Sequence, residues 1–188
     1  MKEAEMILVL GGARSGKSSY AETLAKNSGR EVVYVATSEV KDEEMALRVK
    51  KHREQRPHHW RTVEEPLHPE EKLKGILRPS HIVLMDCLTL WVSNLLLHRD
   101  LPHPRAGFEE KEEYITNKVN SWLEFLHKSN TSAVLVSNEV GWGIVPDNSL
   151  ARAYRDIAGR VNRLCAARAS KVFLTVVGLP VEIKSLVK

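Results

Sequence analysis

Cysteine is scarce in this sequence of 188 residues. The two cysteines, Cys87 and Cys165, lie far apart in the chain and form no CxxC pair. This usage argues against a disulfide framework and against a thiolate zinc site. Long apolar runs are missing as well, because none reaches the roughly 18 residues needed to span a bilayer. The charged N-terminus has no apolar signal-peptide core, so we expect a cytoplasmic protein without a membrane span.

A strong excess of either charge is also missing. Lysine and arginine total 28 and acidic residues total 24, which gives a formal net charge of +4. This mild excess fits an anionic small substrate and fits an ordinary solvated surface equally well. No basic run is interleaved with aromatic residues, so we do not expect nucleic-acid binding. The length and the apolar fraction of 43% predict one domain with its own core over residues 1–188.

Short apolar runs alternate with helical patterns along the chain. Each run is continuous, as expected for a parallel sheet that is covered on both faces. We therefore predict an α/β fold, with a mostly parallel sheet flanked by helices. The predicted strands are 6–10, 32–36, 82–85, 133–136 and 172–177, and the predicted helices lie near 17–27, 41–54, 69–77, 89–97, 110–128 and 148–168.

The second half of the chain carries three further local signals. Apolar residues recur at three- and four-residue steps over 148–168, and Asp147 or Asn148 would cap this helix. Gly178-Leu179-Pro180 predicts a turn, so the chain should end in an antiparallel hairpin with 181–183 as its last strand. The segment 98–107 has two prolines, a glycine and little periodicity, which predicts a mobile loop.

Residues 11–18 fit the pattern GxxxxGK[ST] of a phosphate-binding P-loop. Glycines let successive backbone N–H groups surround a phosphate, and the following helix directs its positive end at the same anion. Lys17 would neutralise the β- and γ-phosphates, and Ser18 would hold Mg²⁺. The alternative is a chance glycine-rich turn, but the loop follows an apolar run and precedes a helical pattern. The predicted nucleotide-binding residues here are Gly11, Gly12, Ala13, Arg14, Ser15, Gly16, Lys17 and Ser18.

A P-loop protein also needs an acidic residue at the end of a second strand, where it holds the metal ion, usually through water. Asp86 directly follows the apolar run 82–85 and is the natural candidate. The alternative is that Asp86 caps the helix that follows, and the two roles are compatible. Ser18 and Asp86 are therefore the predicted metal ligands.

A histidine lies among arginines on the predicted helix 41–54. Arg48 and His52 are four residues apart, which places them on one face, and Pro57 ends the helix. An imidazole can attack phosphorus while guanidinium groups neutralise the charge. The alternative is a surface histidine on an amphipathic helix, and the residue pattern alone favours this alternative.

Several segments, spread over nearly the whole chain, carry a more specific signal. They are GGARSGKS at 11–18, YVATS at 34–38, the segment 42–64 with Arg48, His52, Trp60 and Glu64, DCLT at 86–89, SNEVGWGIVP at 137–146 and RDIAGRVN at 155–162. Together they resemble the bifunctional adenosylcobinamide kinase/adenosylcobinamide-phosphate guanylyltransferase family. The P-loop alone is weakly specific, whereas the last two strings in combination are highly specific.

The resemblance implies a RecA-like P-loop fold, a homotrimer and a two-step enzyme of cobalamin synthesis. First, ATP or GTP would phosphorylate a hydroxyl of adenosylcobinamide. GMP from GTP would then pass through a guanylyl-histidine to the phosphorylated corrinoid. Some members carry two adjacent histidines where this chain has Lys51-His52, so His52 is the single candidate for the guanylylated residue. This implication reverses the interpretation of His52 as a surface histidine.

The resemblance also implies which residues surround the guanosine nucleotide. The residues at matching positions are Ala36, Thr37, Ser38, Arg53, Glu54, Gln55, Arg56 and Glu64, with Asp86 nearby. Two other functions fit the P-loop itself. One is a kinase that phosphorylates another small-molecule hydroxyl without a covalent intermediate. The other is a RecA-like module that binds nucleotide to control its assembly.

Overall fold

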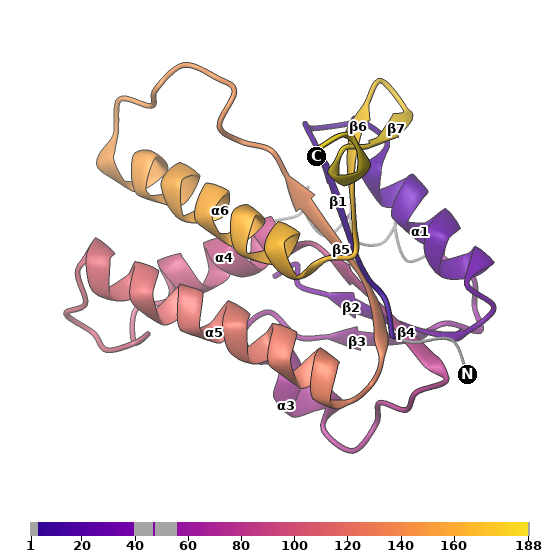
Figure 1. Cartoon of the computed structure of the whole chain (residues 1–188). Helices are drawn as coiled ribbons and strands as arrows, with labels where there is room; N and C mark the ends of the chain where they lie inside the picture. The colour runs from indigo at the N-terminus through magenta and orange to yellow at the C-terminus, as the bar shows by residue number, and fades with distance from the viewer. Residues whose placement is uncertain (1–3, 40–46, 48–55, 188) are drawn as a thin grey trace.

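The computed structural model describes residues 4–39, 47 and 56–187. Within these residues seven strands form one sheet in the order β3-β2-β4-β5-β1-β6-β7 (Figure 1). Every neighbouring pair is parallel except β6 and β7, which are antiparallel. The strands are β1 Met6–Gly11, β2 Glu31–Ala36, β3 Arg61–Glu64, β4 His81–Asp86, β5 Ser132–Asn138, β6 Lys171–Val176 and β7 Leu179–Glu182.

Helices cover both faces of this sheet (Figure 1). Helix α1 packs on one face against β1, β4 and β5, while the other helices of the described residues gather on the opposite face. The central strands are buried on both sides, which explains why their apolar runs are continuous. The helices are α1 Lys17–Asn27, α3 Pro69–Leu73, α4 Leu88–Leu97, α5 Phe108–Lys128 and α6 Ser149–Arg168, and a 3₁₀ turn spans Lys184–Leu186.

The predicted mostly parallel sheet with flanking helices is confirmed, and so are the five predicted strands. One strand, β3, was not predicted from the sequence. It has only four residues, three of which are exposed at the edge of the sheet, so it shows no apolar run. The predicted helix 69–77 is too long, because α3 ends at Leu73 and Gly75 then takes a positive φ of 77°. The predicted helix 41–54 lies outside the described residues apart from Leu47.

The chain ends in the predicted antiparallel hairpin, but its turn lies earlier than expected. Val177 and Gly178 have positive φ angles of 46° and 85° and form the turn, while Leu179 and Pro180 belong to β7. Proline is tolerated there because β7 is an edge strand. Of the two candidate caps of α6, Asp147 and Asn148, the N-cap is Asn148, and its side chain accepts a hydrogen bond of 2.7 Å from the Ala151 N–H.

The segment 98–107 joins α4 to α5 and is tied to both helices. The Lys111 ammonium on α5 donates to the carbonyl oxygens of Leu96 and His98, at 2.6 and 3.0 Å. The Gly107 N–H donates to Glu110 at 2.9 Å, so α5 begins two residues earlier than predicted. None of the described helices is both long enough and apolar enough to cross a bilayer.

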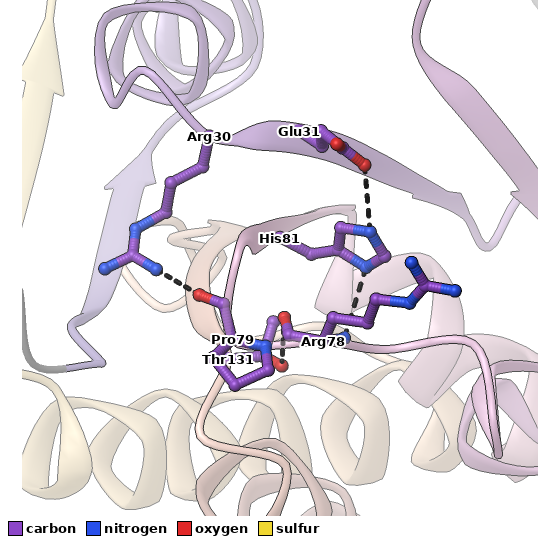
Figure 2. Close-up of polar contacts among 6 residues, drawn as sticks. All are labelled: Arg30, Glu31, Arg78, Pro79, His81 and Thr131. Atoms are coloured by element: carbon purple, nitrogen blue, oxygen red, sulfur yellow. Dashed lines mark hydrogen bonds and ion pairs between the residues drawn. The ribbon is translucent and has the colours of Figure 1, made fainter. Parts of the chain in front are cut away.

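Polar contacts close the amino edge of the sheet (Figure 2). The buried ring of His81 accepts from the Arg78 N–H at Nδ1, 3.3 Å away, so Nε2 carries the proton and donates to Glu31 at 3.1 Å. The Arg30 guanidinium donates to the Pro79 carbonyl oxygen across the same edge. These groups serve the fold, and the carboxyl edge on the opposite side is free for chemistry.

A buried polar link fixes the carboxyl end of β5 against α6. Asn162 is 5% exposed, and its Oδ1 accepts from the Ser137 hydroxyl at 2.6 Å. Its Nδ2 donates to the Asn138 carbonyl oxygen at 3.1 Å. Both side chains are satisfied by each other or by the backbone, so removing one partner leaves a buried polar atom unpaired.

We expect Ser137→Ala to lower the free energy of unfolding by about 1–3 kcal/mol, because Asn162 loses its donor. Asn162→Ala should cost at least as much. The double variant should cost less than the sum, and chemical denaturation measures all three. Ser185→Ala is the matched control, because its hydroxyl is exposed and should contribute within about 0.5 kcal/mol. If the double variant loses the full sum of the two single losses in unfolding free energy, the coupling between Ser137 and Asn162 is contradicted.

Candidate active site

The P-loop joins the carboxyl end of β1 to the first turn of α1. Gly11 is packed so closely that an added Cβ would lie 2.4 Å from Ser15 Oγ and 2.6 Å from the Thr175 carbonyl oxygen. An added Cβ on Gly12 would meet nothing within 4 Å. The two glycines therefore differ: Gly11 allows close packing beneath the loop, whereas the space around Gly12 has room for a side chain.

The turn into α1 requires glycine for a different reason. Gly16 has a φ of 92°, a left-handed conformation that side chains disfavour. Arg14 also has a positive φ, of 56°, so the loop curls around its own N–H groups. The Gly178 N–H of the C-terminal hairpin donates to the Ser15 carbonyl oxygen at 2.9 Å and supports the loop from behind. Lys17 Nζ donates to the Gly12 carbonyl oxygen at 3.1 Å, across the mouth of the loop.

Asp86 ends β4 at the same edge of the sheet. Strand β5 lies between β4 and β1, so Asp86 and the P-loop are two strand spacings apart, about 10 Å. Its Oδ2 accepts from the Tyr34 hydroxyl at 3.1 Å. The N-cap of α4 is Cys87, without a side-chain hydrogen bond, so the alternative role of Asp86 as a cap is wrong.

Arg56 places a buried positive charge against the Tyr34 ring. Its guanidinium carbon lies 3.6 Å from the centre of the Tyr34 ring, and the residue is only 9% exposed. Among the described residues, Nε and one terminal nitrogen of Arg56 are buried without an acceptor. A buried guanidinium with unused donors is an anion-binding arrangement, because unpaired buried N–H groups are costly.

Burial raises the pKa of Tyr34 far above its usual value, and the neighbouring Asp86 carboxylate raises it further. Tyr34 therefore stays protonated and keeps donating to Asp86. Burial and Asp86 also raise the pKa of Cys87. The Cys87 thiol is neutral at pH 7 and is not a nucleophile, since the thiolate is the reactive form.

The ends of three neighbouring strands are aligned at one level of the sheet. Ala36 on β2 pairs with Glu64 on β3 and with Asp86 on β4. Thr37 is fully buried, and its hydroxyl both donates to the Cys87 carbonyl oxygen and accepts from the Cys87 N–H, at 2.8 and 3.0 Å. That hydroxyl is used by the fold, whereas Ser38 is partly exposed at the edge.

The structure thus brings together most of the residues predicted for the site. The P-loop, Ala36 to Ser38, Glu64, Asp86 and Arg56 all lie at the carboxyl edge. His52, Arg53, Glu54 and Gln55 lie outside the described residues. Sequence reasoning missed Tyr34, which joins Arg56 to Asp86, and Asn138 and Glu139, which follow the end of an apolar run as Asp86 does.

Comparison with known proteins agrees with the family resemblance found in the sequence. The family model described as cobinamide kinase/cobinamide phosphate guanyltransferase matches residues 7–183. A protein of Escherichia coli (strain K12), named bifunctional adenosylcobalamin biosynthesis protein CobU, is 46% identical over 181 residues. The alignment covers 95% of this chain and 99% of that protein. The CobP protein of Pseudomonas aeruginosa is 45% identical, over 94% of this chain and 96% of its own.

Two solved structures are more distantly similar. RadB recombinase aligns with a TM-score of 0.49 and 14% identity, over 92% of this chain and 74% of its own. A KaiC-like protein from Pyrococcus horikoshii aligns with a TM-score of 0.47 and 14% identity, over 93% of this chain and 72% of its own.

The glycine geometry predicts different outcomes for two neighbouring substitutions. We expect Gly11→Ala to lower the melting temperature clearly, because the new Cβ would force Ser15 and β6 apart. Gly12→Ala, the matched control, should melt close to the parent because it meets nothing. Thermal denaturation followed by circular dichroism measures both. Equal melting temperatures for the two variants would contradict the close packing beneath the loop.

Proposed function

Because this chain belongs to the cobinamide kinase/cobinamide phosphate guanyltransferase family, we propose that a single nucleotide site serves both reactions of a bifunctional enzyme of adenosylcobalamin synthesis. In the first, ATP or GTP phosphorylates the hydroxyl on the aminopropanol arm of adenosylcobinamide. In the second, GMP passes from GTP to the phosphorylated corrinoid and gives adenosylcobinamide-GDP. The observation that carries the proposal is the P-loop facing Asp86 across β5, with Arg56 buried against Tyr34, whose hydroxyl donates to Asp86.

In the kinase reaction, the P-loop N–H groups and Lys17 hold the triphosphate, and the acceptor oxygen attacks the γ-phosphorus. Ser18 and Asp86 would hold Mg²⁺. The donor set fits this ion, because both groups offer oxygen, and Asp86 Oδ1 has no hydrogen-bond partner among the described residues. The ion would neutralise charge that develops on the phosphates.

In the second reaction, the His52 imidazole attacks the α-phosphorus of GTP, the bond to the β-phosphate oxygen breaks, and pyrophosphate leaves. A phosphate oxygen of the corrinoid then attacks the same phosphorus and releases the histidine. Arg56 supports this role, because its unused donors suit a phosphate.

The remaining residues of the proposed nucleotide site follow from the family positions. Ala36 to Ser38 and Glu64 end β2 and β3 beside Asp86, where the guanosine would lie. Arg53, Glu54 and Gln55 complete the segment between His52 and Arg56. A homotrimer, which the family implies, and the cytoplasmic location expected from the N-terminal sequence are further parts of the proposal.

Two competing functions differ in measurable ways. A kinase of another small hydroxyl compound would form no covalent nucleotide intermediate. A module that binds nucleotide only to control assembly would turn over no corrinoid and would change its sedimentation with nucleotide. The labelling experiment below separates both from the proposed enzyme.

We expect the protein to become labelled when it is incubated with GTP that carries a labelled α-phosphate. His52→Ala should abolish this label, because the attacking imidazole is gone. His59→Ala is the matched control, since His59 is exposed in the following loop and should label like the parent. Labelling of His52→Ala at the parental level would show that His52 is the wrong residue.

Lys17→Ala should reduce both activities, by about 10²-fold or more, because one loop holds the triphosphate in both reactions. The measurements are γ-phosphate transfer to cobinamide and GMP labelling from GTP. Lys26→Ala, on the exposed last turn of α1, is the matched control and should keep both. Retention of either activity by Lys17→Ala would indicate separate nucleotide sites.

A further inference from the structure

Glu139 lies at the point where β5 meets the P-loop. Strand β5 runs between β1, which carries the P-loop, and β4, which ends at Asp86. Asn138 pairs with Gly11 in the β1–β5 ladder, and the Glu139 N–H donates to the Gly11 carbonyl oxygen at 3.0 Å. The residue that leaves β5 therefore starts between the proposed phosphate site and the proposed metal ligand.

The backbone before Glu139 is held from several directions. Asn138 Nδ2 donates to Thr89 Oγ1 at 3.1 Å, and the Asn138 carbonyl oxygen accepts from Asn162 at 3.1 Å. Thr89 is itself fixed by the Cys87 sulfur at 3.1 Å. Helices α4 and α6 thus clamp the end of β5, which is the rigid support that a catalytic group requires.

Only one of the two Glu139 carboxylate oxygens accepts a hydrogen bond within the described residues. Its Oε1 accepts from the Gly141 N–H at 2.8 Å, which fixes the side chain over its own loop. Its Oε2 has no hydrogen-bond partner among the residues that the structure describes, and the side chain is partly exposed. One oxygen therefore sets the orientation, and the other is available to a ligand.

Phosphorylation of a hydroxyl requires a group that takes its proton as the oxygen attacks phosphorus. Two other acids end strands at this edge. Asp86 has one oxygen on Tyr34 and would use the other for the metal. Glu64 lies beyond β2, at the end of the edge strand β3. Glu139 is the carboxylate whose chain position adjoins the P-loop directly.

We propose that Glu139 is the general base of the kinase reaction. The acceptor oxygen forms a bond to the γ-phosphorus, the bond from that phosphorus to the β–γ bridging oxygen breaks, and the nucleoside diphosphate leaves with the electron pair. The hydroxyl proton goes to Glu139 Oε2. This assignment rests on the proposed function, since it takes the P-loop as the triphosphate site.

The loop that follows Glu139 has a surface suited to a large acceptor. Trp142 and Ile144 are 75% and 96% exposed, which is unusual for apolar side chains of this size. An acceptor whose hydroxyl hangs from a large ring with apolar faces would contact these residues while its hydroxyl reached Glu139. The same loop would then hold the acceptor and supply the base.

Glu139→Gln tests the assignment directly. Glutamine keeps an oxygen to accept from Gly141, so the loop is preserved, but it cannot take a proton. We expect the rate of γ-phosphate transfer to cobinamide to fall by about 10²–10⁴-fold. GMP labelling of His52 should stay within about twofold of the parent, because an imidazole needs no such base. Glu124→Gln, at an exposed position on α5, is the matched control and should keep both activities.

Gly141→Ala is a second test, because it keeps the Glu139 carboxylate but changes its position. The added Cβ would lie 3.0 Å from Glu139 Oε1, so the carboxylate would have to shift by a few tenths of an ångström. The γ-phosphate transfer should fall, by a smaller factor than in Glu139→Gln, while GMP labelling is kept. This variant shows whether the orientation of Glu139 matters as well as its charge.

Two results with Glu139→Gln would overturn the assignment of the base. One is γ-phosphate transfer at the parental rate. The other is an equal loss of γ-phosphate transfer and GMP labelling in a variant that melts like the parent, which would make Glu139 a support for the P-loop.

Failure of the proposed function would look different, because the parent protein itself would transfer no γ-phosphate to cobinamide. The assignment of Glu139 as the base would then be wrong as well.

Discussion

The site depends on the close packing of Gly11 against Ser15 and the carbonyl oxygen of Thr175. Without a Cβ at this position, β1 can end directly beneath the P-loop, and the loop can curl back over its own strand. The positive φ of Gly16 then turns the chain into α1, whose first N–H groups face the same space. The hairpin turn at Gly178 closes this arrangement from behind. The loop that we propose as a phosphate cradle thus takes its shape from backbone geometry.

Around the cradle, buried polar side chains fix the ends of the neighbouring strands. Thr37 ties β2 to Cys87, and Asn94 on α4 donates to the Thr37 carbonyl oxygen at 2.7 Å. Thr89 and Asn162 hold the end of β5 in the same way. These groups are satisfied within the protein, so they give the edge a single arrangement at little cost. Arg56, Asp86 and Glu139, to which we assign chemistry, each keep a polar atom without a partner among the described residues.

In the proposed mechanism, one loop serves attack on two different phosphorus atoms because separate groups, Glu139 and His52, act in the two reactions. The P-loop and the metal ligands would hold the triphosphate similarly in both reactions. The attacking group would differ: a hydroxyl with Glu139 for the γ-phosphorus, and His52 with Arg56 for the α-phosphorus. The two protein groups, Glu139 and His52, follow different strands in the sequence, β5 and β2. Neither needs to move the phosphate cradle.

The sequence alone determined the P-loop, the α/β class and the family, because each depends on local pattern: glycine spacing, continuous apolar runs and long matching strings. It also narrowed the cap of α6 to Asp147 or Asn148, since capping is a contact between near neighbours, and the structure shows Asn148. Only the tertiary structure decided the rest. The edge strand β3 has no apolar run, and the end of α3 depends on a positive φ at Gly75. The stacking of Arg56 on Tyr34 and the clamping of β5 next to Gly11 join residues far apart in the chain, and no local pattern records which distant side chain a strand end will meet.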